Sequence, residues 1–131
     1  MKSIIKKMLY AGIRKFAKLY EVSEDKIQFL IFARPGSFGS PLMYWVYVDG
    51  QPKKEISFKE AIDKDGKLSF VNHEAIATQF IANKLNGYIA VDKIEPDKIS
   101  FMLYEFKNDI NISVFDGSEN IDELTLNDLF E

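Results

Sequence analysis

The chain contains no cysteine and only one histidine among its 131 residues. Without thiols it can form neither disulfides nor a cysteine-ligated zinc site, and it has no thiol nucleophile. The single histidine, His73, has Glu74 as its only acidic neighbour, so we interpret it as an exposed residue at a helix start and not as part of a catalytic dyad. A cysteine-free chain fits a reducing compartment, so we expect a cytoplasmic location.

Long hydrophobic runs are also missing. The longest, Phe29–Ala33 and Leu42–Val48, fall far short of the roughly 20 residues that a membrane span needs. The first residues, MKSIIKKMLYAGIRKF, are basic and partly apolar, but charges interrupt them too often for a signal peptide, with a mitochondrial-type presequence as the alternative. We therefore expect a soluble protein with no membrane span.

Two loop segments look like binding motifs until they are compared position by position. The segment DKDGK at 63–67 resembles a calcium loop, but a loop starting at Asp63 has Lys67 and Leu68 at its fifth and sixth positions, where an oxygen ligand and a glycine belong. The segment RPGSFGSP at 34–41 lacks the Lys-Ser/Thr of a phosphate loop, although its backbone N–H groups and Arg34 leave anion binding open. We predict no enzyme, no metal and no cofactor.

Hydrophobic periodicity predicts one α+β domain over residues 1–131, with a mainly antiparallel sheet of about five to six strands, two amphipathic helices packed on it and a short C-terminal helix. The expected helices cover residues 3–20, the segment from the N-cap Asn72 to the stop signal at Gly87, and 121–130, where Thr125 and Asp128 form a capping pair. The expected strands cover residues 26–33, 42–48, 54–58, 88–94, 98–106 and 110–115, with Asp49–Gly50 as a tight hairpin turn and Pro52 at a sheet edge.

Two of the expected strands carry similar sequences. DKIQFLIF at 25–32 and DKISFMLY at 97–104 share four of eight residues at an offset of 72, and each follows an amphipathic helix. One interpretation is a repeat of helix–strand–strand units over 1–70 and 71–131. The other is that two core strands with similar turns simply look alike.

Charge is distributed unevenly along the chain. Residues 1–20 carry six basic groups and no acid, whereas residues 109–131 carry seven acids and no base. The acidic end suits a basic protein partner, for which Asp116, Glu119, Asp122 and Glu123 are the predicted contacts. Phe38 in the 34–41 loop and Trp45 in an aromatic strand are the predicted apolar anchors, and Trp45 is either core or interface.

The basic end supports a different prediction. Lys7, Arg14 and Lys18 fall on the outer side of the first helix and, with Arg34, would contact nucleic acid or another anionic surface. The chain has no helix-turn-helix, zinc-finger or RNA-recognition pattern, and its net charge is −3, so a nucleic-acid partner is the second choice. Whether the chain forms a homodimer stays open.

The order of segments resembles that of the small bacterial immunity proteins of the YezG-like kind. The resemblance runs from Ile13-Arg-Lys-Phe through DKIQFLIFARPGSFGSPLMYWVYVDG at 25–50 to DKISFMLYEFKNDINISVF at 97–115. It consists of an amphipathic helix, a strand before a Ser/Gly loop, an aromatic strand before a DG turn, and a later aromatic hairpin near an acidic end. The resemblance implies a non-enzymatic protein that binds and neutralises a toxin. A phage-type anti-defence inhibitor is the alternative within the same class.

Overall fold

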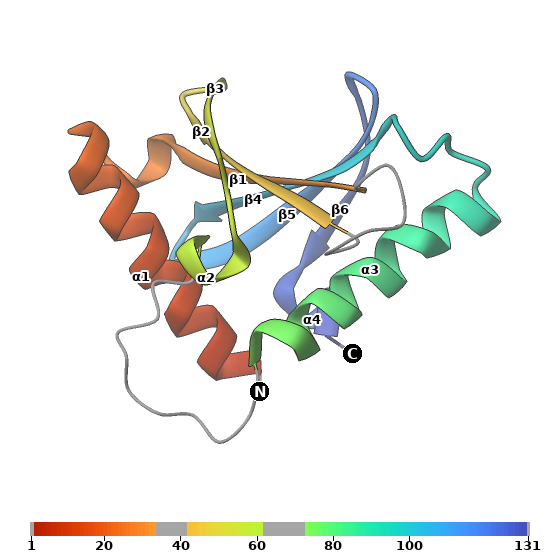
Figure 1. The fold of residues 1–131 in the computed structure, drawn as a ribbon, viewed down its shortest axis with the longest axis horizontal. Coiled ribbons are helices and arrows are strands. Elements are labelled where there is room, and N and C mark those ends of the chain that lie inside the picture. Colours follow the sequence, from red (N-terminus) through yellow and green to blue (C-terminus); the bar gives the residue numbers. More distant parts are fainter. Residues whose placement is uncertain (1, 34–41, 62–72, 131) are drawn as a thin grey trace.

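The computed structural model describes residues 2–33, 42–61 and 73–130 (Figure 1). The elements follow in the order α1 (Lys2–Tyr20), the short 3-10 helix η1 (Glu24–Lys26), β1 (Ile27–Ala33), β2 (Leu42–Val48), β3 (Gln51–Ile56), α2 (Phe58–Ala61), α3 (His73–Val91), β4 (Ile99–Phe106), β5 (Asp109–Asp116), β6 (Glu119–Thr125) and α4 (Leu126–Phe130).

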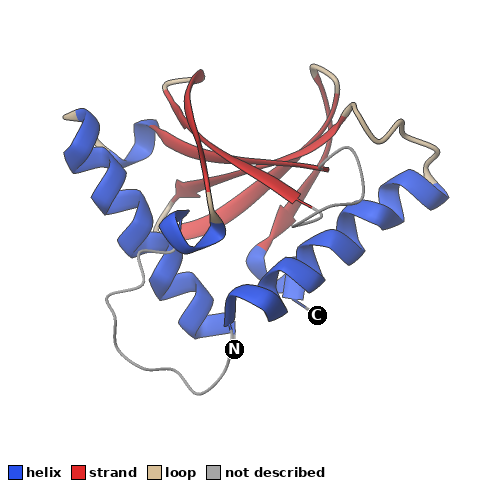
Figure 2. Ribbon diagram, in the orientation of Figure 1, coloured by secondary structure: helices blue, strands red, loops and turns tan. Residues whose placement is uncertain are grey.

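The six strands form one sheet in the order β3-β2-β1-β4-β5-β6, and every neighbouring pair is antiparallel. The two long helices, α1 and α3, lie on the same side of this sheet (Figure 2). This architecture confirms the predicted α+β domain with a mainly antiparallel sheet. No described helix is both long and apolar enough to cross a membrane.

The two halves of the chain have the same order of elements. In each half a helix of 19 residues precedes three antiparallel strands and a short helix. The similar segments at 25–32 and 97–104 contain most of β1 and β4, which are the central neighbours of the sheet. This common order supports the predicted repeat of units, which stays a prediction.

The hydrophobic core lies between the sheet and the helices. The apolar stripe of α1, which was predicted as an amphipathic helix over residues 3–20, is buried there: Ile5, Leu9, Ile13 and Phe16 are each at most 2% exposed. Phe16 packs edge-on against Phe29 of β1 at 5.8 Å between ring centroids. On the other half of the sheet, Tyr88 of α3 packs edge-on against Phe101 of β4 at 6.0 Å. Each long helix is therefore anchored by an aromatic contact to one of the two central strands.

Turn chemistry fixes the hairpins. Asp49 and Gly50 have φ values of 50° and 79°, which confirms the predicted tight turn between β2 and β3. Lys107 and Asn108 have φ values of 53° and 60° between β4 and β5, although neither is glycine. Both pairs fit the two-residue turn that matches the right-handed twist of the strands.

The predicted end of the second helix is wrong. Helix α3 continues through Gly87 to Val91, and the strand expected at 88–94 does not form. One glycine inside a helix costs about 1 kcal/mol, which the packing of Tyr88 and Ile89 against the core offsets. The helix ends instead before Lys93, at a φ of 60°, where the Ile94 N–H donates to the Tyr88 carbonyl at 3.4 Å.

The predicted helix at 121–130 is also partly wrong, because its first half is strand β6 and only Leu126–Phe130 is helical. Pairing with β5 satisfies the backbone of 119–125 better than a short isolated helix would. The predicted capping pair is confirmed: the Asp128 N–H donates to Thr125 Oγ1 at 3.3 Å, and the Thr125 N–H donates to Asp128 Oδ2 at 2.9 Å.

The third strand begins at Gln51 instead of residue 54, and Pro52 lies on the sheet edge as expected.

Candidate binding surfaces

The four acids predicted to contact a partner lie on two different sides of the β5–β6 edge. Asp122 is opposite Val114 and Asp116 is opposite Ile99, and both of these partners are buried under the helices. Glu119 is paired with Asp116 and therefore shares its side. Glu123, one residue after Asp122, points to the other side of the sheet. The acidic end of the sequence thus supplies two separate surfaces.

On the helix side, Asp122 is held by a side chain from α3. The Tyr88 hydroxyl donates to Asp122 Oδ2 at 2.7 Å, and the Glu123 N–H donates to Asp122 Oδ1 at 2.9 Å. Burial raises the pKa of Tyr88 well above its usual range, and the hydrogen bond and charge of Asp122 raise it further. Tyr88 therefore remains a neutral hydroxyl donor, and Asp122 is fixed beside it.

Two shallow depressions adjoin at this position. They have volumes of about 300 Å³ and 360 Å³, and they share Tyr88 and Asp92 as lining residues. Val91 is 77% exposed and Ile121 is 38% exposed at their margins. We call this surface the acidic hollow; its defining residues are Tyr88, Val91, Asp92, Asp116, Ile121 and Asp122.

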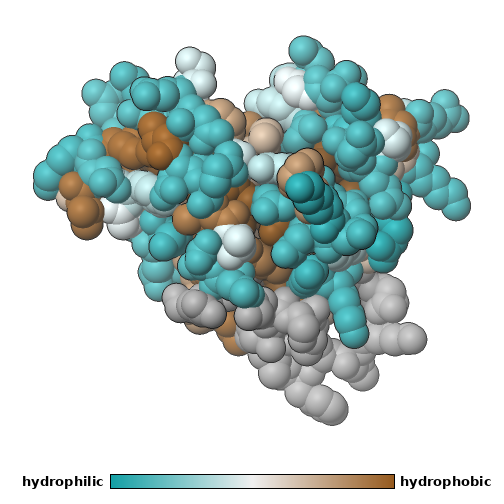
Figure 3. All heavy atoms as spheres, turned by 180° about the vertical axis from the view of Figure 1, so that it is seen from behind, coloured by the Kyte–Doolittle hydropathy of each residue, from teal (hydrophilic) through white to brown (hydrophobic). Residues whose placement is uncertain are grey.

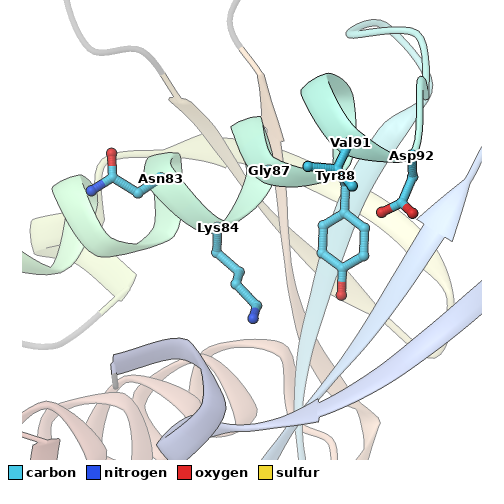
Figure 4. Close-up of a pocket in the computed structure, with 6 residues that line it drawn as sticks. All are labelled: Asn83, Lys84, Gly87, Tyr88, Val91 and Asp92. Carbon is cyan, nitrogen blue, oxygen red and sulfur yellow. The ribbon is translucent and has the colours of Figure 1, made fainter.

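Figure 4 shows how α3 contributes to the acidic hollow. Lys84 and Tyr88 point from the helix toward the sheet and α4, whereas Asn83 points away. Asp92 follows the last turn of the helix and lies beside Tyr88 in this view. The backbone and side-chain hydrogen bonds of Thr125 lower the pKa of Asp128 in α4, and the charge of Lys84 lowers it slightly further. The one cation among the lining residues thus lies on the α4 side of the hollow, and carboxylates occupy the β5–β6 side.

On the other side of the sheet, Glu123 is held by three side-chain donors. Ser113 Oγ donates to its two carboxylate oxygens at 2.8 and 3.1 Å, Asn120 Nδ2 donates at 2.7 Å, and the Tyr104 hydroxyl donates at 3.3 Å. Ser113 is only 3% exposed, so this anchor is shielded from water. The Glu123 carboxylate therefore has a fixed position on this side of the sheet.

Glu123 ends a row of residues that crosses all six strands. The row, read through the strand pairings, is Glu55, Trp45, Leu30, Met102, Ser113 and Glu123. A second row consists of Tyr47, Gln28, Tyr104 and Asn111, and a third of Met43, Phe32, Ser100 and Phe115. We call these three rows the open face, because no described helix packs on them. Trp45 belongs to this face and is partly exposed, whereas its neighbours Tyr44 and Val46 are buried on the helix side.

Two hairpins rise beyond the open face. Figure 1 shows the β2–β3 and β5–β6 hairpins rising on the side of the sheet away from α1 and α3. Seen from behind in Figure 3, hydrophilic side chains cover most of the molecule, hydrophobic ones form separate patches, and the upper margin dips between two lobes. The two lobes correspond to the two raised hairpins, with the sheet between them.

The basic residues predicted to bind an anion are on α1. Lys7, Arg14 and Lys18 are exposed on its outer side, and the neighbouring Lys6 forms an ion pair with Asp109 at 3.0 Å. Arg34 and Phe38 lie outside the described residues, as does the side chain of His73. Neither the acidic hollow nor the pocket lined by Glu24, Asp25, Glu105, Phe106, Lys107 and Asn108 contains Lys7, Arg14 or Lys18.

In comparisons with known proteins, no family model, curated protein or solved structure matches this chain. Within residues 2–33, 42–61 and 73–130, no group of three or more His, Cys, Asp or Glu side chains is placed to hold a metal ion. The candidate surfaces are therefore defined by their own geometry alone.

Sequence reasoning missed several residues of these surfaces. Tyr88 and Asp92 escaped notice because Gly87 was interpreted as the end of the helix, which placed both in a strand. Leu30 and Met102 lie in apolar segments of two predicted strands, and only the sheet's single helical layer shows that they face away from it. The one sign of this in the sequence is that Leu30 and Met102 occupy the same position in the similar segments at 25–32 and 97–104.

Proposed function

We propose that this chain is a non-enzymatic protein-binding module of the bacterial immunity or inhibitor kind, acting in the cytoplasm by occluding a basic partner. The observation that carries the proposal is the acidic hollow, where Asp92, Asp116 and Asp122 surround a tyrosine beside exposed apolar surface. A phage-type anti-defence inhibitor would use the same surface against a different partner.

The acidic hollow has the chemistry that accepts a lysine or arginine side chain. The stem of such a side chain packs on apolar surface while its charged head needs carboxylates, and Val91 and Ile121 lie beside the acids. Each oxygen of Asp122 accepts one hydrogen bond within the chain and keeps a second lone pair for a partner. Because Tyr88 holds Asp122 in place, little side-chain entropy is lost when the partner binds.

Charge also favours a protein partner over a nucleic acid. Phosphates would meet Lys7, Arg14 and Lys18 on α1, but an exposed cationic helix face without a groove gives only weak, salt-dependent binding. The carboxylates of the acidic hollow would repel the same phosphates. A basic protein would meet the better-ordered group of charges, because Tyr88 holds Asp122 in place. The protein partner is therefore the stronger proposal.

The test starts with capture of the partner from a lysate of the native host and its identification by mass spectrometry. The double variant Asp116→Lys/Asp122→Lys should then bind the identified partner at least about tenfold more weakly, because close charge pairs contribute more than 1.4 kcal/mol. The control Asp25→Lys/Asp97→Lys makes the same change of net charge at exposed residues of η1 and of the turn before β4, and it should bind as the parent does. Equal weakening by both variants would mean that the net charge of the protein, and not the acidic hollow, determines partner binding. Capture of nucleic acid, lost on raising salt and on replacing Lys7, Arg14 and Lys18 by Ala, would overturn the proposal.

A further inference from the structure

We infer that the free edge of the sheet at β6 takes up an extended segment of a basic protein as a further strand, with lysine or arginine at alternate positions of that segment. This rests on the proposed function, because the segment belongs to the basic partner, and it specifies how that partner docks beside the acidic hollow. The two strands to compare are β6 (Glu119–Thr125) and β3 (Gln51–Ile56), which form the two edges of the sheet.

Strand β6 has a neighbour on one side only. It pairs with β5, and no other described strand lies beyond it. Every residue of β6 except Leu124 is exposed. An edge strand presents a row of backbone N–H and C=O groups without a strand partner, and an extended chain can add to that row by strand pairing. The β6 edge therefore has the backbone groups that a further strand needs.

The opposite edge, β3, has the same pairing geometry as β6. In each terminal hairpin two residue pairs follow the turn, and the register then shifts. These pairs are Val48–Gln51 and Tyr47–Pro52 in the β2–β3 hairpin, and Asp116–Glu119 and Phe115–Asn120 in the β5–β6 hairpin. Pro52 of β3 and Asn120 of β6 therefore occupy equivalent positions.

A proline closes the β3 edge to a further strand. Proline has no backbone N–H, and within a sheet it occurs on an edge strand with its nitrogen facing away from the neighbouring strand. A strand added to β3 would lose a hydrogen bond at Pro52 and would meet its ring. Asn120, at the equivalent position, keeps its N–H, and β6 contains no proline. Of the two edges, β6 is the one that can donate at this position.

Charge selects a basic segment for the β6 edge. Glu119 and Asp122 point to the helix side, Glu123 points to the other side, and β6 contains no basic residue. Opposite charges on adjacent strands stabilise the pairing, whereas like charges directly opposite each other destabilise it. Alternate residues of an added strand face the same side of the sheet. Lysine or arginine at alternate positions would therefore meet the helix-side carboxylates together.

Two of these carboxylates are held in place within the chain. The Tyr88 hydroxyl donates to Asp122 at 2.7 Å, and Ser113 Oγ and Asn120 Nδ2 donate to Glu123 at 2.8 and 2.7 Å. Each side of β6 thus carries one carboxylate with a fixed position, which limits the side-chain entropy lost on binding. The same charges repel nucleic-acid phosphates, which also cannot pair with a strand edge through a peptide backbone.

A second copy of the chain is the competing occupant. Pairing of two β6 edges would place carboxylates opposite carboxylates, which is unfavourable. Pairing of β6 with the β3 edge of another copy would bring Lys53 and Lys54 toward the acids, but Pro52 interrupts that edge. Neither edge of the chain therefore matches β6, and a basic segment of a different protein fits it better.

Synthetic peptides test the strand pairing with the full chain. The probe is a labelled nine-residue peptide of alternating lysine and threonine, whose binding is followed by fluorescence anisotropy. The same peptide with glutamate in place of lysine should bind at least about tenfold more weakly. The lysine peptide with every backbone nitrogen methylated keeps its charges but donates no backbone hydrogen bond, and it should also bind at least about tenfold more weakly. The unmethylated lysine peptide should slow amide hydrogen exchange in β6 and not in β3.

Variants of Asn120 locate the contact. Asn120→Pro gives β6 the residue that β3 has at the equivalent position, and it should weaken binding of the lysine peptide at least about fivefold because the N–H is lost. The matched control Asn120→Ala also removes the side-chain hydrogen bond to Glu123 but keeps the backbone N–H. It should bind the peptide within about twofold of the parent. Circular dichroism shows whether each variant keeps the fold, and the three peptides with the unaltered chain keep the test decisive where a variant unfolds.

Four outcomes would overturn the inference. They are equal binding of the lysine peptide and either control peptide, unchanged hydrogen exchange in β6, equal peptide binding by Asn120→Pro and Asn120→Ala, and self-association of the chain that Asn120→Pro abolishes, which would assign the edge to a second copy.

The proposed function can fail or survive separately. A captured basic protein that is lost in Asp116→Lys/Asp122→Lys but binds Asn120→Pro as tightly as Asn120→Ala would support the proposed function and remove strand addition at β6. Binding of the lysine peptide at β6, with no basic protein captured from the host, would support strand addition and remove the proposed function.

Discussion

The two faces of the same sheet differ in how they use apolar residues. Facing the helices, Phe29 and Phe101 are at most 1% exposed. One residue further along the same strands, Leu30 and Met102 point the other way and are partly exposed. The covered face is aliphatic or aromatic in its centre and carries Glu105, Asp116 and Asp122 only toward the ends of its strands and its β6 edge, whereas the open face mixes aromatic residues with serine, asparagine and glutamine in its centre.

This difference separates what maintains the fold from what is available to a partner. Burial removes the centre of the covered face from water, and each large side chain there contributes about 1.5–3 kcal/mol. The open face gains less from folding and leaves apolar area in contact with water. A partner that covers it adds the burial that the chain itself does not provide.

The largest expected effect comes from adjacent residues of β4. Phe101→Ala removes a buried ring that packs against Tyr88 and should destabilise the protein by about 3–5 kcal/mol. Met102→Ala, on the open face, should cost less than about 1.5 kcal/mol, because part of its side chain is already in water. Urea unfolding followed by circular dichroism measures both. Equal losses would mean that the open face is as important to the fold as the covered one.

A smaller contrast involves one tyrosine hydroxyl on each face. Tyr44, on the covered face, forms a hydrogen bond with Thr78 Oγ1 of α3 at 3.1 Å, and burial raises its pKa to about 12. Tyr44→Phe leaves the Thr78 hydroxyl without this partner and should cost about 1 kcal/mol. Tyr104→Phe, on the open face, removes the longest of the hydrogen bonds to Glu123, at 3.3 Å, and should cost less than about 0.5 kcal/mol. The same urea experiment resolves the two variants, and a reversed order would contradict the contrast.

Local signals in the sequence predicted much of the fold. The stripe of α1, the Asp49–Gly50 turn and the Thr125–Asp128 cap depend on residues within a few positions of one another, and the structure contains all three. The end of α3 was missed because a local stop signal at Gly87 was outweighed by the packing of Tyr88 against the core, which the sequence does not display.

The candidate surfaces were less predictable because they depend on strand register. Asp122 and Glu123 are adjacent in sequence, yet pairing with β5 puts them on opposite sides of the sheet. A shift of one residue would exchange them. Similarly, β1 is apolar on both sides, so its pattern does not reveal which side the helices cover. Charge composition identified the acidic end, and only the register divided it into two surfaces.

The smallest predicted effect concerns Glu105, which points to the helix side at the end of β4, opposite the buried Ile110. Burial raises the pKa of Glu105 above the ordinary value of a glutamate, 4.5, and the charge of Glu24 and a hydrogen bond with it raise this pKa further. Well below pH 4.5 both the folded and the unfolded chain hold this proton, so Glu105 has no effect on stability there. As the pH rises above that value the unfolded chain releases the proton first. Ionisation of Glu105 therefore opposes folding, fully so above its folded-state pKa.

Glu105→Gln removes this penalty and should stabilise the protein at pH 7 by less than about 1 kcal/mol, with no gain at pH 3. Thermal unfolding at both pH values measures the difference. The control Glu119→Gln removes a carboxyl from the exposed β6 edge and should not reproduce the pH-dependent gain. A gain for Glu105→Gln that is equal at pH 3 and pH 7 would exclude ionisation as its cause. It would show that packing, and not charge, limits the stability of the protein even at the margin of the covered face.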